Sequence, residues 1–378
     1  MSKPILFQFN DAVTLAGEQI TGFCYVRIPL DMPKVQIVLT FQTKEYSKVL
    51  EKKQIPYDES NPQMIPEKLI EKKQSVQITL DSPIGQQKYA QKKYELNGNL
   101  LYRIFRYYGT HDSFIYTQEL YNGSVKAGDY KFNFNIPTQF NMPSSFQYKS
   151  NDGQKQGKCG YMVTLKIDSP EEARTIMTES TDVYLNSRFK ETEQFRQLEG
   201  NIVHFLCLNS GAVELSVKLK TNKFTPGDRI TVEYSVDNTR SQRPINRIEA
   251  RVINKLIFID NDEVERIIED LVVVSQQWNG LSAGQNKDRI LSILELPKEL
   301  KASLKTNTIK NQYFFQLEAI VDSFLTWLSV PVICQIPIHI QELQMLPRIN
   351  LDGWNLVSNL NVSIGNFPNV SIEQSYIP

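Results

Sequence analysis

The stretch "NKFTPGDRITVEYSVDN" (residues 222–238) decides the fold class of this chain. After the turn-forming residues Pro226-Gly227-Asp228, apolar and polar side chains alternate from position 230 to 236. Because successive side chains of a strand point to opposite faces, this run predicts a strand with one core face and one solvent face. Such strands are typical of antiparallel sheets that pack on one side only.

A similar segment, "NDAVTLAGEQITGFCYVRIPL" (residues 10–30), occurs about two hundred positions earlier in the chain. There Gly17-Glu18 precedes an alternating run, as Gly227-Asp228 does in the later segment. Glycine suits a turn that needs a positive φ, and the acid can accept hydrogen bonds from the free amides of the turn. The chain has 378 residues, more than one ordinary core requires, so the repeat predicts two domains of one type in tandem.

Alternating segments separated by turn sequences recur along most of the chain. They cover residues 20–28, 35–41, 101–107, 114–120, 130–136, 161–167, 175–185, 213–220, 248–259, 314–321 and 332–340. Short strands at this density predict an all-β protein built from β-sandwiches. Residues 66–74 and 188–200 are the two helical candidates, and the second lies between the repeated halves.

Each half also closes in the same way. A strand ends at a proline, a serine-containing loop follows, and a tyrosine opens the next alternating strand. These residues are Pro137, Ser144, Ser145 and Tyr161 in the first half and Pro297, Ser303 and Tyr313 in the second.

The composition argues against several classes of protein. The chain has 42 Lys+Arg against 42 Asp+Glu, and no basic stripe with interleaved aromatic residues stands out, so a nucleic-acid function is not expected. The first ten residues, "MSKPILFQFN", lack the apolar region of a secretory signal, and no run of about 18 apolar residues predicts a membrane span. The four cysteines are scattered without CxxC spacing. These features predict a cytoplasmic protein without a disulfide framework.

No motif predicts catalysis. The three histidines, His111, His204 and His339, are far apart, and neither HExxH nor GxSxG is present. We therefore expect no catalytic residue, no cofactor and no metal site. Residues 256–260, "LIFID", match the clathrin-box pattern, but they continue an alternating run and are better explained as a buried strand.

Taken in order, these motifs resemble those of arrestin-fold proteins, and the arrestin-domain-containing (α-arrestin-like) group more than the receptor arrestins. The N-terminal part of the resemblance rests on Gly17, Glu18, Ile20, Gly22, Cys24, Val26, Tyr130, Phe132, Phe134, Ile136, Pro137, Met142, Pro143, Ser144, Ser145 and Phe146. The C-terminal part rests on Gly211, Val213, Leu215, Val217, Phe224, Pro226, Gly227, Asp228, Ile230, Val232, Val236, Asn238, Pro331, Ile336, Pro337 and Ile338.

The resemblance implies two tandem immunoglobulin-like β-sandwiches and a non-enzymatic adaptor role. It divides the chain into an N-domain (1–188), a connector (189–208), a C-domain (209–342) and a tail (343–378). The implied partners are other proteins, namely membrane-protein tails and trafficking machinery, in the cytoplasm or at a membrane surface. A second interpretation stays open, in which the chain is a structural subunit of a large assembly and the fold is a rigid interaction module.

The sequence departs from the family pattern at two places. α-Arrestins recruit HECT-type ubiquitin ligases through PPxY motifs, and this sequence contains no Pro-Pro pair, so we expect no recruitment of that kind. The stretch 44–98 is longer than expected between early N-domain strands. It contains Lys52-Lys53, Lys72-Lys73 and Lys92-Lys93, which are best interpreted as solvated loop charges and not as phosphate sensors.

The tail is too apolar for a disordered segment. In residues 355–373 apolar side chains alternate with polar ones, which predicts an added strand that joins a sheet edge. Its candidate partner-binding residues are Leu360, Val362, Ile364, Val370 and Ile372. Receptor arrestins fold their tails back onto the N-domain, so the resemblance implies the same here, with pairing to another chain as the alternative.

Overall fold

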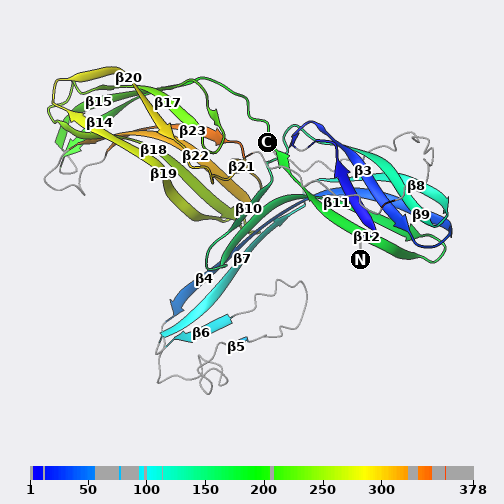
Figure 1. Ribbon diagram of the computed structural model, residues 1–378. Coiled ribbons are helices and arrows are strands. Elements are labelled where there is room, and N and C mark those ends of the chain that lie inside the picture. The colour runs from blue at the N-terminus through cyan, green and yellow to red at the C-terminus, as the bar shows by residue number, and fades with distance from the viewer. Residues whose placement is uncertain are drawn as a thin grey trace, which may run out of the picture.

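The computed structural model describes residues 3–11, 13–55, 76–77, 93–97, 100–112, 114–204, 208–321, 331–342 and 354. Within these ranges the regular secondary structure consists of β-strands, with no helix. The expected all-β fold with two β-sandwich domains is therefore confirmed, and Figure 1 shows the two sandwiches side by side.

The first half of the chain contributes thirteen strands. They are β1 (Ile5–Phe9), β2 (Thr14–Leu15), β3 (Gln19–Ile28), β4 (Met32–Ile55), β5 (Val76–Gln77), β6 (Lys93–Asn97), β7 (Leu100–His111), β8 (Ile115–Val125), β9 (Gly128–Pro137), β10 (Phe146–Lys149), β11 (Lys155–Ser169), β12 (Arg174–Val183) and β13 (Leu185–Asn186). A three-stranded sheet, β1-β3-β9, packs on an eight-stranded sheet whose path is β10-β11-β4-β7-β6-β5, with β8 and β12 at its sides.

The second half contributes ten strands. They are β14 (Gln194–His204), β15 (Leu208–Leu219), β16 (Lys223–Phe224), β17 (Arg229–Asp237), β18 (Ile245–Ile259), β19 (Glu265–Leu281), β20 (Asn286–Glu295), β21 (Leu304–Lys305), β22 (Ile309–Val321) and β23 (Val332–Ile340). A four-stranded sheet, β14-β15-β17-β20, faces a six-stranded sheet, β16-β23-β22-β18-β19 with β21 beside β22.

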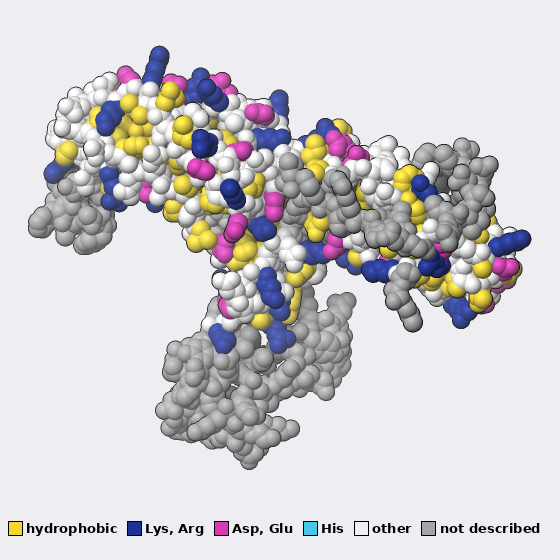
Figure 2. Space-filling model, viewed as in Figure 1, with side chains coloured by type: hydrophobic (Ala, Val, Ile, Leu, Met, Phe, Trp, Pro, Cys, Tyr) yellow, Lys and Arg dark blue, Asp and Glu magenta, His cyan; other side chains and the backbone are white. Residues whose placement is uncertain are grey.

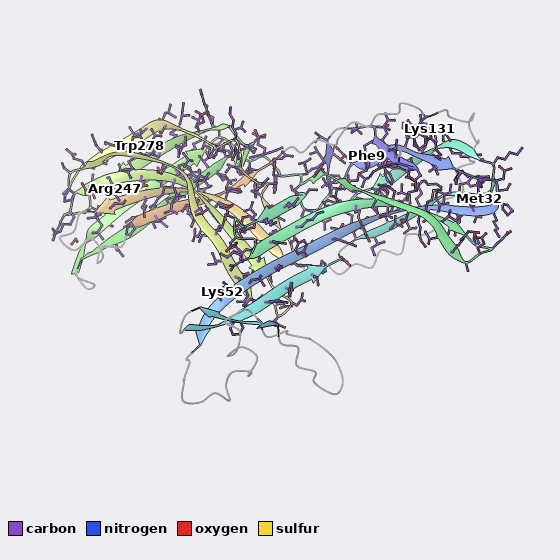
Figure 3. All side chains as sticks on the ribbon, turned by 60° about the horizontal axis from the view of Figure 1, so that its bottom comes forward. Phe9, Met32, Lys52, Lys131, Arg247 and Trp278 are labelled. Carbon is purple, nitrogen blue, oxygen red and sulfur yellow. The ribbon has the colours of Figure 1, made fainter. Side chains whose placement is uncertain are left out.

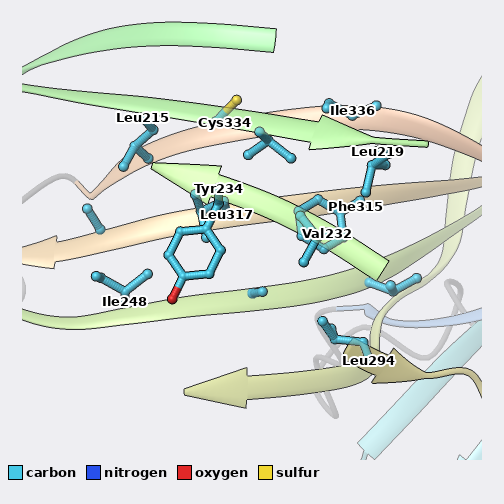
Figure 4. Close-up of a cluster of buried hydrophobic side chains, with 14 of the residues drawn as sticks. Leu215, Leu219, Val232, Tyr234, Ile248, Leu294, Phe315, Leu317, Cys334 and Ile336 are labelled. Carbon is cyan, nitrogen blue, oxygen red and sulfur yellow. The ribbon is translucent and has the colours of Figure 1, made fainter. Parts of the chain in front are cut away.

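Each pair of sheets encloses its own apolar core. The alternation that predicted the strands places every second side chain inside, so that Val232 and Phe315, for example, meet between the sheets of the second half with no exposed surface. Figure 4 shows this core, where side chains from β15, β17, β18, β22 and β23 interdigitate. The core of the first half is drawn from residues between Ile5 and Leu185.

One strand extends well beyond its sandwich. β4 pairs with β8 and β11 over its first part, and from Glu45 to Ile55 it pairs with β7. We call the paired segments 45–55 of β4 and 100–111 of β7 the arm. Figure 1 shows the arm projecting from the underside of the molecule, between the two sandwiches.

The helix expected over 188–200 is wrong. Residues 194–204 form β14, which pairs with β15 along nearly its whole length. The inter-strand hydrogen bonds and the packing of Leu198 on the core outweigh the modest helix propensity of this charged run. The other helical candidate, 66–74, lies outside the described residues.

The two Gly-acid pairs form matching turns. In the first, the Glu18 amide donates to the Leu15 carbonyl (3.0 Å), Gly17 has φ +84°, and the Leu15 amide donates to the Glu18 carboxylate (3.0 Å). A positive φ at the third position of a turn closed in this way is typical of type II geometry, which glycine adopts without strain.

The second turn repeats this arrangement. The Asp228 amide donates to the Thr225 carbonyl (3.1 Å), Gly227 has φ +88°, and the Thr225 amide donates to the Asp228 carboxylate (2.5 Å). Pro226 occupies the second position, where its fixed φ suits a type II turn. The same local chemistry therefore introduces β3 and β17.

We predict that Gly17→Val and Gly227→Val each lower the free energy of unfolding by about 1–3 kcal/mol, because a β-branched side chain is strained at positive φ. Thermal or denaturant melts measure the effect. Asparagine, which tolerates positive φ, is the matched control at Gly227, where a Cβ atom would come no closer than 3.4 Å to Lys298, and it should retain most of the stability there. At Gly17 a Cβ atom would also lie 2.7 Å from the Phe140 ring, so asparagine should recover less of the stability. Val variants that melt like wild type would show that these glycines are not required by the turns.

The closing loop of the first half is fixed by a serine and a tyrosine. The Ser145 amide donates to the Leu185 carbonyl (2.7 Å), and its hydroxyl accepts from the Leu185 amide (3.0 Å). The buried Tyr161 hydroxyl donates to the carbonyl of Pro143 (2.6 Å), two residues before that serine. The Ser145 amide, the Pro143 carbonyl and both backbone groups of Leu185 are thus hydrogen-bonded within the protein, as buried backbone groups require.

The second half uses the same pairing pattern. The Ser303 amide donates to the Ile340 carbonyl (2.8 Å), and its hydroxyl accepts from the Ile340 amide (2.8 Å). The Tyr313 hydroxyl donates to the carbonyl of Lys301 (3.0 Å), again two residues before the serine. The repeat seen in the sequence is therefore also a repeat of side-chain roles.

Candidate functional site

The two sandwiches meet at a small apolar cluster, which we call the junction. The end of β18 and residues of β19, β21 and β22 pack there against β4, β10 and β11. Its buried members are Val49, Phe146, Cys159, Leu256, Phe258, Ile268, Leu304 and Ile309, with Tyr107 and Tyr148 at the side.

Two glycines allow the backbones to approach closely at the junction. A Cβ atom at Gly109 would lie 2.1 Å from the Ile259 carbonyl oxygen, and one at Gly157 would lie 2.6 Å from the Phe258 ring. The Ser47 hydroxyl also donates to the Ile259 carbonyl (2.9 Å). The C-terminal end of β18 therefore packs closely against the N-terminal sheet, and neither glycine position has room for a larger residue.

A backbone hydrogen bond crosses the junction beside these glycines. The Asn261 amide donates to the Tyr108 carbonyl (2.9 Å), and the Thr110 amide donates to the Asn261 side-chain oxygen (3.0 Å). This pair ties the loop after β18 to the edge of β7, so the arm and the second sandwich are linked by directional contacts as well as by apolar packing.

Arg266 is the main charged group at the junction. Its guanidinium donates to the Asp260 carboxylate (3.0 Å) and the Glu51 carboxylate (3.5 Å), and it lies 3.2 Å from the centroid of the Tyr107 ring. Although burial acts to raise the pKa of Asp260, hydrogen bonds from the Val264 amide and Arg266 lower it overall. Charge-assisted bonds of this kind are among the stronger polar contacts in proteins.

Glu45 is the buried acid of the junction. It is 4% exposed, and it accepts a hydrogen bond from the Thr308 hydroxyl of the second sandwich (3.4 Å). Burial, the largest influence, raises the pKa of Glu45, and the contacts with Thr306, His111 and Thr308 offset this only in part. The charged form of Glu45 is therefore less favourable in the folded protein than in the unfolded chain.

We predict that wild type loses stability between acid and neutral pH because of Glu45, and that the Glu45→Gln variant does not show this loss. The folded-state pKa of Glu45 is raised, so its contribution is fully present below the ordinary glutamate pKa and is lost as the pH rises through the folded value. Melting temperatures of both proteins from about pH 4 to 7.5 test this. The variant should gain relative to wild type as the pH rises; equal curves would contradict the prediction.

The sequence motif at 256–260 lies inside this junction. Leu256 is 2% exposed and Phe258 is 1% exposed, and both belong to β18. A clathrin box must be an exposed extended peptide, so these residues serve packing, as the sequence predicted.

Most of the other residues singled out in the sequence lie away from the junction. Phe146 is the exception, because it follows the Pro143-Ser144-Ser145 loop and enters the junction cluster. Asn238 is fully buried and donates to the carbonyls of Arg243 and Ser282, which fixes two loops at the far end of the second sandwich. Of the closing prolines, Pro137 ends β9 and Pro337 lies within β23, where it is exposed.

Within the described residues no cluster of His, Cys, Asp and Glu is suited to hold a metal ion. No helix in the described part of the chain is long and apolar enough to cross a membrane.

Comparison with known proteins identifies the fold family. Residues 209–345 match the family model of the arrestin (or S-antigen) C-terminal domain. The two β-sandwiches of this chain have the arrestin fold. Arrestin domain-containing protein 5 of Bos taurus is 22% identical over 219 residues, which cover 57% of this chain and 65% of that relative. The aligned region thus spans slightly less than two thirds of the relative's length.

In this arrestin-fold protein the described part of the C-terminal tail touches the N-terminal sandwich. Tyr25 and Arg27 point outward from the sheet β1-β3-β9, away from its core. Trp354 packs edge-on against the Tyr25 ring (6.2 Å between centroids), and the Arg27 guanidinium lies 4.6 Å from the Trp354 ring. Tyr25 is only 3% exposed despite its outward direction, so its outer face is covered.

Neighbouring groups complete this contact surface. Arg27 forms two hydrogen bonds with Asp129 of β9 (2.7 and 2.9 Å), and Lys131 lies 3.6 Å from the Phe23 ring. Cations over aromatic faces and paired charges make a surface that accepts an aromatic side chain with neighbouring polar groups. The candidate tail residues Leu360, Val362, Ile364, Val370 and Ile372 lie outside the described residues.

Proposed function

We propose that this arrestin-fold protein is a non-enzymatic adaptor that binds membrane-protein tails or components of the trafficking machinery. The observation that carries the proposal is the contact of Trp354 with Tyr25 and Arg27, because it brings the C-terminal tail onto an outer sheet face of the N-terminal sandwich. A tail held there by one aromatic and one cation–π contact can be displaced by a competing peptide.

In this proposal residues 355–373 add as a strand to the N-terminal sandwich next to Trp354. The alternation of Leu360, Val362 and Ile364 with polar residues supports this, since an alternating strand needs a sheet edge to pair with. β1 is an edge strand of the sheet that Trp354 contacts. The domain limits 1–188, 189–208, 209–342 and 343–378 remain part of the same proposal, although β14, inside the segment 189–208, pairs with β15 of the second sandwich.

Affinity purification from cells tests the adaptor function with three forms: the full chain, a truncation after Glu342 and the Trp354→Ala variant. We expect membrane proteins, coat components or ligases to be recovered, and in larger amounts with both altered forms, because the outer sheet face is then open. Equal recovery with all three forms would show that the tail does not control access of partners to the outer sheet face. Recovery of no trafficking component with any form would overturn the adaptor function.

The arm favours a second candidate function, that of a structural subunit in a large assembly. β4 is 24 residues long and extends past its own sandwich with β7, which provides a projecting element for assembly contacts. One stoichiometric complex of fixed composition in the same purification would support this function over the adaptor role.

A further inference from the structure

One face of the arm and of the sheet beside it concentrates positive charge, in a chain whose formal net charge is zero. We call it the basic face. Its members lie on the three neighbouring strands β4, β7 and β11 and point away from the second sandwich. They are Lys44, Tyr46, Lys48, Leu50, Lys52, Arg106, Tyr108 and Lys158.

The strand register places these side chains together. Tyr46 lies opposite Lys158 on β11, Lys48 lies opposite Tyr108 on β7, and Leu50 lies opposite Arg106. Because directly opposed residues of antiparallel strands point to the same side of the sheet, cations from three strands share one face. Figure 3 shows Lys52 on the arm, and Figure 2 shows Lys and Arg side chains on its described surface.

The opposite face of the same strand carries the acids. Glu45 and Glu51 point toward the second sandwich, where they meet Thr308 and Arg266. Successive side chains of this part of β4 thus alternate between two faces. Acidic side chains point into the junction, and basic side chains point into solvent. The lysines on the solvent face are not needed for the packing of the two sandwiches.

Two lysines of this face are available for a ligand, because Lys44 and Lys48 take part in no ion pair among the described residues. Lys158 pairs with Asp182 (3.3 Å), and Lys52 and Arg106 have contacts of their own. Tyr46 and Tyr108 are 37% and 44% exposed. From Lys44 to Lys52 the face extends roughly 26 Å along the strand, at about 3.3 Å per residue.

We propose that the basic face binds an anionic membrane surface. A sheet face three strands wide presents lysines and tyrosines over an area and not in a groove, which suits a surface of many anionic headgroups better than one extended peptide. Tyrosine rings favour the interface between headgroups and acyl chains, where their apolar ring and polar hydroxyl are both satisfied. The arm projects from the underside of the molecule, away from both sandwich cores (Figure 1).

This membrane contact is independent of the adaptor function proposed above, since it uses the arm and not the tail. The full chain is incubated with vesicles of phosphatidylcholine containing about 30% phosphatidylserine, and with pure phosphatidylcholine vesicles, in about 0.1 M salt, and bound protein is measured by co-sedimentation. We expect binding to the anionic vesicles only, and release at about 1 M salt, because Lys44 and Lys52 are exposed and Lys48 is partly exposed, so that salt screens their charges.

The decisive variant is Lys44→Glu/Lys48→Glu, which should lower the vesicle affinity at least about tenfold. Lys220→Glu/Lys298→Glu is the matched control, because it makes the same charge change at exposed positions of the second sandwich and should bind like wild type. Melting curves show that both variants fold. If the charge reversal impairs folding, Lys44→Gln/Lys48→Gln replaces it, with a smaller loss of affinity expected.

Three results would overturn the proposal. The first is absence of wild-type binding to anionic vesicles at low salt. The second is equal binding by the arm variant and the control. The third is binding to polyglutamate but not to vesicles, which would assign the basic face to an acidic protein partner instead.

Discussion

Phe258→Ala is expected to lower the free energy of unfolding by about 3–5 kcal/mol, the usual cost of removing a buried aromatic ring. The Phe258 side chain is 1% exposed, stands edge-on to Tyr148 (5.9 Å between centroids) and fills the space left by Gly157. Because these contacts join the two sandwiches, the loss should appear as earlier denaturant unfolding and as faster proteolysis between them.

Phe195→Ala is the matched control for this variant. Phe195 lies on β14 and is 63% exposed, so its removal should change stability by no more than about 0.5 kcal/mol. If Phe258→Ala unfolded at the same denaturant concentration as Phe195→Ala, the junction would not be a packed interface, and the two sandwiches would have to be held together by other contacts.

Arg266→Ala should cost about 3 kcal/mol, in the range found when one partner of a buried ion pair is removed. The Asp260 side chain is 7% exposed and would keep its charge without the guanidinium that pairs with it. The variant also loses the contacts with Glu51 and the Tyr107 ring. Denaturant unfolding at neutral pH measures the effect.

The same variant should be less sensitive to acid than wild type. The folded-state pKa of Asp260 is lowered, so its contribution is present above the ordinary aspartate pKa and is lost as the pH falls through the folded value. Removing Arg266 removes part of that lowering. Stability curves of wild type and variant should therefore converge as the pH falls toward about 2–3.

Arg240→Ala provides the comparison for Arg266→Ala. Arg240 pairs with Glu199 and Glu214, but all three side chains are at least 30% exposed, and such surface pairs contribute about 1 kcal/mol or less. Similar losses in the two arginine variants would mean that the polar contacts of the junction are no stronger than surface ion pairs. Arg266→Lys should lie between wild type and Arg266→Ala, because lysine keeps the charge and loses the two-nitrogen contact with Asp260.

Much of this fold follows from local sequence patterns. Alternation of apolar and polar residues predicts the strands, because each strand of a sandwich has one face in the core and one in solvent. The Gly17-Glu18 and Gly227-Asp228 pairs predict the two matching turns, because positive φ is a property of single residues. The sequence also indicates the tandem repeat and the fold family.

Other features depend on contacts between residues far apart in the chain. Residues 194–204 have the composition of a helix but form β14, since pairing with β15 supplies hydrogen bonds that local propensity does not predict. The charge alternation of β4 is visible in the sequence, but which face enters the junction is not. That choice follows from the position of the second sandwich.

The candidate functional surfaces depend on tertiary structure. Ser47 contacts Ile259, 212 positions away, and Trp354 reaches Tyr25 from the other end of the chain. The sequence alone established the strands, the turns and the repeat, because each depends on the order of neighbouring side chains. Only the folded chain placed Phe258, Arg266 and the lysines of the arm, because a junction between two sheets is specified by shape and charge on both sides at once.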